Sequence, residues 1–165
     1  MTIKAEHLLR TLILIILSCI IGSYGYWKRR MIMLLNELSL EEKKTFWNIA
    51  NVLASVDGNA PEEESVLKQY SEEMGADFEL ISPEGIDVRA ELGSIRSSSL
   101  KSRKIMYFEL FGVAYADTQF DEKEQKILDD ACSILEIPDD VRITLEESVK
   151  CIYDTYRKLA DVFND

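Results

Sequence analysis

Histidine is nearly absent from this chain, since His7 is the single one among 165 residues. Imidazole is the usual general base near neutral pH, so its scarcity argues against His-based catalysis and His-rich metal sites. The three cysteines, Cys19, Cys132 and Cys151, have no C-x-x-C spacing, and their odd number does not suit a disulfide scaffold. The sequence also lacks a Gly-rich phosphate loop. Carboxylates therefore carry most of the ionisable chemistry, and we expect no catalytic residues and no enzymatic activity.

Basic residues are fewer than acidic ones, and they are unevenly distributed along the chain. The formal net charge is -11, but residues 1–30 contain five basic side chains and one acidic one, which leaves -15 on the remainder. A surface this acidic repels phosphate backbones, so we expect no nucleic-acid partner. The small cluster of Lys101, Arg103 and Lys104 does not reverse this balance. Cations or basic patches on another protein are the expected partners.

A long apolar run occurs near the N-terminus. Residues 11–27 are uncharged, and the run reaches back to Leu8 if Arg10 snorkels, which gives about 20 residues, the length of a membrane-spanning helix. Three basic residues, 28–30, follow the run and predict that the rest of the chain lies on the cytoplasmic side. Two interpretations remain open. Either residues 8–27 anchor a single-pass protein at the inner face of the cytoplasmic membrane, or translation starts at Met31 or Met33 and the protein is cytoplasmic.

No segment shows sustained period-two alternation, so the sequence predicts an all-α fold after the N-terminal segment. We expect a hydrophobic segment over residues 1–30 and one helical domain over 31–165. Ser39 and Glu42 form a capping-box pattern, and Pro61 suits the first position of a helix. Six or seven helices are expected, over 40–56, 61–75, 83–93, 100–116, 121–135 and from about 139 onward. The 40–56 and 100–116 helices are apolar on several sides and should be central.

The two halves of the domain repeat a short pattern at the break between helices. The stretch "LASVDGNAPEEESVL" begins at Leu53, and "VAYADTQFDEKEQKI" begins 60 positions later at Val113. Four residues recur at matching positions: Ala54, Asp57, Glu62 and Glu64 correspond to Ala114, Asp117, Glu122 and Glu124. The repeat therefore predicts a bundle made of two helix-loop-helix halves.

These stretches, extended over residues 33–160, resemble the tellurite-resistance TerB family and its TerB-like relatives. The specific parts are the "A-x-x-D-G" helix end, the glutamate seven residues after that aspartate, and the matching "A-x-x-D" to "E-x-E" in the second half. The resemblance implies a compact, all-helical bacterial module in a stress response, without catalytic activity. It also implies an acidic ion-binding patch at Asp57, Glu64, Asp117 and Glu124. The second turn departs from the pattern, because Thr118 stands where the first has Gly58.

Two interpretations of the four acids remain open. In the first, Asp57 and Asp117 accept hydrogen bonds from amides in their own turns, and Glu64 and Glu124 favour the starts of the next helices. In the second, the two turns lie side by side and share a divalent cation, Ca²⁺ before Mg²⁺, because hard cations prefer clustered oxygens. EF-hands are excluded, since the required glutamate is replaced by Lys68 or Leu128.

The function predicted from these observations is a non-enzymatic binding module that binds a divalent cation through its acidic cluster. No organic cofactor is expected. The alternative is an ion-independent adaptor or scaffold that binds an unknown protein partner, tethered at the membrane through residues 8–27 if that segment is retained.

Overall fold

The computed structural model describes residues 33–56, 58, 61–75, 78, 82–117 and 121–164. They belong almost entirely to one compact unit, Leu35–Asp165. The predicted membrane segment, residues 8–27, lies outside the described residues, and its helix stays a prediction. Among the helices that are described, none combines the length and the hydropathy needed to cross a bilayer.

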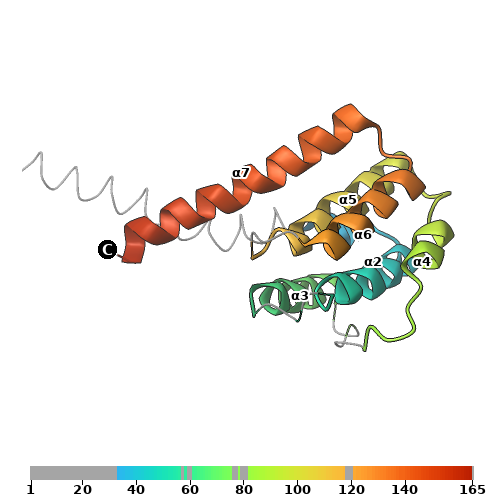
Figure 1. Ribbon diagram of the computed structural model, residues 1–165, viewed down its shortest axis with the longest axis horizontal. Coiled ribbons are helices and arrows are strands. Elements are labelled where there is room, and N and C mark those ends of the chain that lie inside the picture. Colours follow the sequence, from blue (N-terminus) through green and yellow to red (C-terminus); the bar gives the residue numbers. More distant parts are fainter. Residues whose placement is uncertain are drawn as a thin grey trace, which may run out of the picture. The chain divides into compact units, whose positions relative to one another are not determined.

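Secondary structure is helical throughout the described residues, which confirms the all-α prediction (Figure 1). The elements, in order, are the 3-10 helix η1 (Met33–Glu37), α2 (Leu40–Leu53), α3 (Pro61–Met74), α4 (Val88–Ser94), α5 (Leu100–Ala114), α6 (Glu122–Ile134) and α7 (Asp139–Asn164).

Local capping explains why the first α-helix begins where the sequence predicts. The Ser39 amide donates to Glu42 Oε2 at 2.7 Å, and the Glu42 amide donates to Ser39 Oγ at 3.3 Å. This reciprocal pair satisfies two amides that the helix itself leaves unbonded. The helix ends earlier than predicted, at Leu53, because the chain tightens into a turn in which the Ser55 amide donates to Val52 O at 3.0 Å.

The predicted start of the short fourth helix at residue 83 is wrong. Helix α4 begins at Val88, where the Asp87 carboxylate caps it by accepting from the amides of Arg89 and Ala90 at 3.0 and 3.1 Å. The chain before it forms a turn at Gly85, whose φ of 84° lies in the left-handed region that glycine tolerates. Proline at the start of a helix and proline before a turn give similar sequence signals, so Pro83 misplaced the boundary.

The core lies between α2 and α5, as predicted. These two helices pack on each other, α4 packs on α2, α6 and α7 pack on α5, and α3 packs on both central helices. Fully buried side chains come from both: Phe46, Ile49 and Leu53 from α2, and Tyr107 and Leu110 from α5. In Figure 1, α7 runs alongside α5 and continues past its end.

Candidate functional site

The described residues that flank the two acidic turns are in contact. The Lys123 ammonium, in the first turn of α6, donates to the backbone carbonyl of Val56 at 2.9 Å. Val56 stands immediately before Asp57, so this bond joins a residue that follows the second acidic turn to one that precedes Asp57 in the first. The cation-binding interpretation requires this proximity.

In the second turn, the described acids form a helix cap. Asp121 Oδ1 accepts from the amides of Lys123 at 2.7 Å and Glu124 at 2.8 Å, and Glu124 Oε2 accepts from the Asp121 amide at 2.9 Å. The result is a capping box that mirrors the one at Ser39. Glu124 is fully buried, whereas Asp117 is half-buried just after α5. Glu124 thus has a structural contact of the kind that the turn-residue interpretation predicts.

The first turn is described only in part, because Asp57 lies outside the described residues. Helix α3 begins at Pro61 and carries three glutamates in its first turn. Glu63 is fully buried, while Glu64 is exposed. The structure therefore separates two neighbouring acids that the sequence could not distinguish.

Burial shows how the two halves correspond. The buried positions of α2 recur 60 positions later in α5, and those of α3 recur 61 positions later in α6. The second turn is thus one residue longer than the first. Glu63, and not Glu64, is the structural counterpart of Glu124, because both occupy the third position of their helices and both are fully buried. A constant spacing of 60 had paired Glu124 with Glu64.

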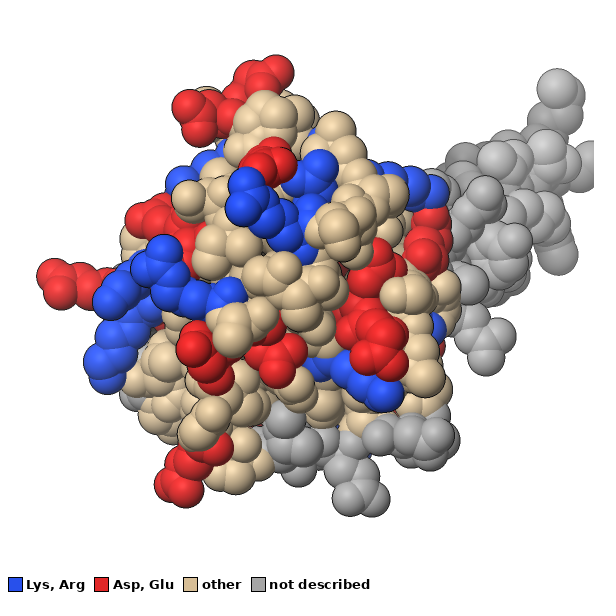
Figure 2. All heavy atoms as spheres, turned by 90° about the vertical axis from the view of Figure 1, so that its right-hand side faces the viewer, with Lys and Arg blue, Asp and Glu red and all other residues tan. Residues whose placement is uncertain are grey.

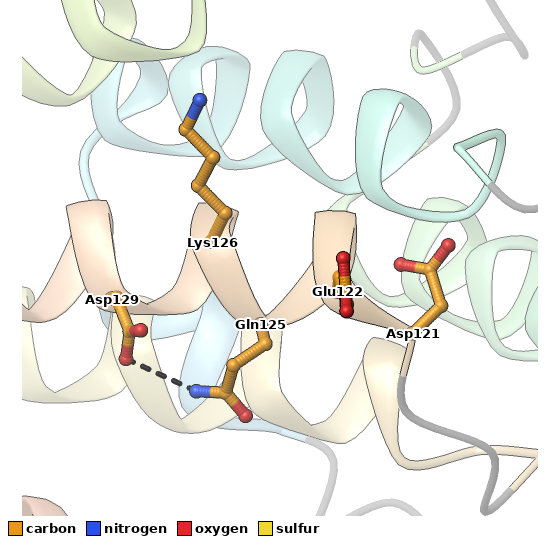
Figure 3. A pocket seen from close by; sticks show the side chains of 5 residues that line it. All are labelled: Asp121, Glu122, Gln125, Lys126 and Asp129. Atoms are coloured by element: carbon orange, nitrogen blue, oxygen red, sulfur yellow. Dashed lines mark hydrogen bonds between the residues drawn. The ribbon is translucent and has the colours of Figure 1, made fainter.

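A shallow depression runs along the exposed side of α6 from the second turn. It has a volume of about 400 Å³ and is lined by five polar residues, Asp121, Glu122, Gln125, Lys126 and Asp129 (Figure 3). Asp129 is occupied by internal contacts, since it accepts from Gln125 at 3.0 Å and from Arg142 at 2.8 Å. Within the described part of the chain, no three His, Cys, Asp or Glu side chains are grouped closely enough to hold a metal ion. The four-carboxylate site includes Asp57 and stays a prediction.

Acidic and basic side chains are interleaved on the face shown in Figure 2, and neither sign covers it. Several basic residues of the described chain form ion pairs. Lys101 pairs with Glu37, and Arg103 donates to the Leu135 carbonyl at 2.6 Å and to Glu136 at 3.4 Å. Two members of the basic cluster noted in the sequence, Lys101 and Arg103, are therefore engaged in contacts within the domain.

A buried carboxyl that the sequence analysis missed lies on α5. Glu109 is 4% exposed, and its Oε2 accepts from the Tyr70 hydroxyl of α3 at 2.7 Å. Burial raises the pKa of Glu109 to about 7, although the Tyr70 bond lowers it. Burial, followed by the nearby charge of Glu109, also raises the pKa of Tyr70 and of Tyr153 on α7. The available signal was an acid inside the apolar run "FELFGVA" of a helix expected to be central.

The end of α7 presents apolar side chains to solvent. Leu159 is 39% exposed, Val162 is 70% exposed and Phe163 is 72% exposed. Closer to its middle, α7 is held on α5 by Tyr153, which donates to the Gly112 carbonyl at 2.9 Å, and by Arg157, which lies over the Tyr115 ring. The exposed residues follow directly after this anchored part.

Comparison with known proteins identifies one family. Residues 49–147 match the family model described as tellurite resistance protein TerB, and the matched span contains both acidic turns. No curated protein and no solved structure matches the chain.

Proposed function

This chain belongs to the TerB family, and from that premise we propose that it is a non-enzymatic binding module of a bacterial, tellurite-resistance-type stress response. The single observation that supports a site for this function is the Lys123 to Val56 bond, which links described residues that flank the two acidic turns. The module would then work by binding, with the paired turns as its ligand-facing surface.

We propose a divalent cation as the ligand, Ca²⁺ before Mg²⁺. Asp57 and Asp117 would supply oxygens from the two turns, with Glu64 and Glu124 one turn into the following helices. Carboxylates gathered without a cation repel one another, and a hard ion with flexible coordination relieves that repulsion. The Lys123 ammonium already places one positive charge at this junction. A weak affinity is therefore expected.

Melting experiments on the full chain test the cation. A ligand that binds only the folded state at about a hundredfold excess over Kd adds about 2.7 kcal/mol, so the melting temperature in EDTA should rise when excess Ca²⁺ is added. Asp57→Asn combined with Asp117→Asn should abolish that rise. Glu147→Gln combined with Asp161→Asn, two exposed acids of α7, makes the same change in net charge and should leave it intact. The absence of any shift with Ca²⁺, Mg²⁺, Mn²⁺ or Zn²⁺ would reject the ion.

The second candidate is an ion-independent protein adaptor. The exposed apolar side chains at the end of α7 favour it, because such side chains on a soluble surface commonly belong to contacts with another protein. EDTA separates the two candidates once a partner has been purified: an adaptor binds its partner equally with and without chelator, whereas an ion-dependent module does not. Fractionation with mass spectrometry of the N-terminus would decide whether residues 8–27 tether the module to the membrane.

A further inference from the structure

Glu109 breaks the internal repeat at a position where the fold does not need an acid. The residue 60 positions earlier, its counterpart in α2, is Ile49, which is fully buried. The same place in two equivalent helices thus holds an apolar side chain in one half and a carboxyl in the other. An ionised carboxyl without full compensation is costly to bury, so packing alone does not account for Glu109.

The surroundings of Glu109 leave it poorly compensated. Its Oε2 accepts from Tyr70, while its Oε1 is buried and has no hydrogen-bond partner in the described part of the chain. Tyr70 of α3 and Tyr153 of α7 both interact with the charge of Glu109, while the charges of Glu73 and Arg157 act on Tyr70 and Tyr153 respectively. Among the described residues, no charge from α2, α6 or α7 shifts the pKa of Glu109, which depends on burial and the Tyr70 bond.

Helix α3 contacts Glu109 directly, through the Tyr70 hydroxyl, and it is strongly acidic. Its sequence, PEEESVLKQYSEEM, contains five glutamates and one lysine. It packs on α5 and α2 less extensively than those two helices pack on each other. The Tyr70 hydroxyl also lies close to α5 at Gly112, where an added Cβ would come within 3.1 Å of it. The contact between Tyr70 and α5 is therefore tight, and it is centred on one titratable group.

We propose that Glu109 is a proton-controlled latch for α3: α3 stays packed on α5 while the buried carboxyl is neutral, and loss of the proton leaves a buried charge that the Tyr70 bond offsets only in part, which favours a local opening in which α3 leaves α5 and the carboxylate becomes hydrated. Small cooperative units of a fold open in this way without global unfolding. Acidification therefore tightens α3, and neutral pH loosens it.

The pH window follows from the two states of Glu109. The pKa is about 7 when α3 is closed and near the ordinary 4.5 when the carboxyl is hydrated. Below pH 4.5 both states are protonated, so the closed state keeps its full advantage. Between pH 4.5 and pH 7 the opening of α3 releases a proton, so the equilibrium constant for opening rises about tenfold per pH unit. Above pH 7 both states are ionised and the constant levels off, after a total rise of about 300-fold.

Amide hydrogen exchange of the full chain, read by mass spectrometry, tests the latch. After correction for the intrinsic pH dependence, peptides from α3 should exchange about tenfold faster per pH unit from pH 5 to 7, and then level off. Peptides from α6, which packs on α4 and α5, should lack this rise. Glu109→Ile, which copies the counterpart Ile49, should give α3 flat exchange, and Glu109→Gln should do the same if the isoleucine variant does not fold.

Tyr70→Phe gives an independent check, because the Tyr70 bond lowers the pKa of Glu109. Without the hydroxyl the rise in α3 exchange should continue past pH 7 before it levels off. The latch is overturned by any of three results: α3 exchange that shows no such rise in the wild type, the same rise in Glu109→Ile or Glu109→Gln, or a rise shared equally by all helices. A plateau that stays at pH 7 in Tyr70→Phe would also overturn it.

Discussion

Replacing Glu124 with alanine should destabilise the domain more than replacing Glu122, although both are acids in the first turn of α6. Glu124 is fully buried and accepts from the Asp121 amide at 2.9 Å, whereas Glu122 is exposed. The alanine variant loses a hydrogen bond worth about 1 kcal/mol and leaves an amide unsatisfied at a further cost of about 1–3 kcal/mol. Water can reach the half-buried Asp121, so we expect a total near the lower end, about 2 kcal/mol.

The control, Glu122→Ala, removes only a favourable charge near the positive end of α6, which costs about 0.5 kcal/mol. Urea unfolding followed by circular dichroism measures the unfolding free energy of both variants. A difference of about 1.5 kcal/mol between them should also separate their melting temperatures by roughly 6 °C. Equal losses would refute the assignment of Glu124 to the cap. The same comparison in the first half distinguishes the two alignments, because Glu63→Ala should resemble Glu124→Ala and Glu64→Ala should resemble Glu122→Ala.

Two further predictions concern glycines and cysteines. Gly58→Ala should lower the unfolding free energy by about 1 kcal/mol, because Gly58 has a φ of 120°. Gly93→Ala should raise it by about 0.5–1 kcal/mol, because Gly93 lies inside α4 with open space around it. Equal effects of the two variants in urea titrations would contradict the backbone assignment. Cys151 is exposed and Cys132 is buried, so a thiol reagent should label Cys151 first in the folded protein, and peptide mapping that finds Cys132 labelled as fast would contradict its burial.

Helix positions were predictable wherever the signal was local. Ser39 with Glu42 and Pro61 each placed a helix start at the residue where the structure has it. Such signals work because caps act within one turn of the chain. The predicted start of α4 at residue 83 was wrong because the cap that acts there, Asp87, lies further along the chain.

The correspondence between the halves was predictable only in part. Matching Asp57 with Asp117 required one spacing of 60, and that spacing holds for α2 and α5. The extra residue in the second turn changes which glutamate faces inward, because a shift of one position rotates a helical side chain by about 100°. Three consecutive glutamates at the start of α3 hide that shift in the sequence, so burial was needed to identify Glu63. Glu109 was hidden differently, since one acid in a hydrophobic helix reveals neither its depth nor its partner Tyr70.

Helix α3 connects the two proposals physically. Its first turn carries Glu63 and Glu64, and about two turns further on Tyr70 meets Glu109. An opening that removes Tyr70 from α5 would also move the start of α3, which follows the first acidic turn. A cation held by both turns would then bind the closed state in preference to the open one, and by reciprocity the bound ion would reduce the opening of α3. The melting response to Ca²⁺ and the exchange of α3 are separate measurements, so a latch without an ion site and an ion site without a latch give different pairs of results.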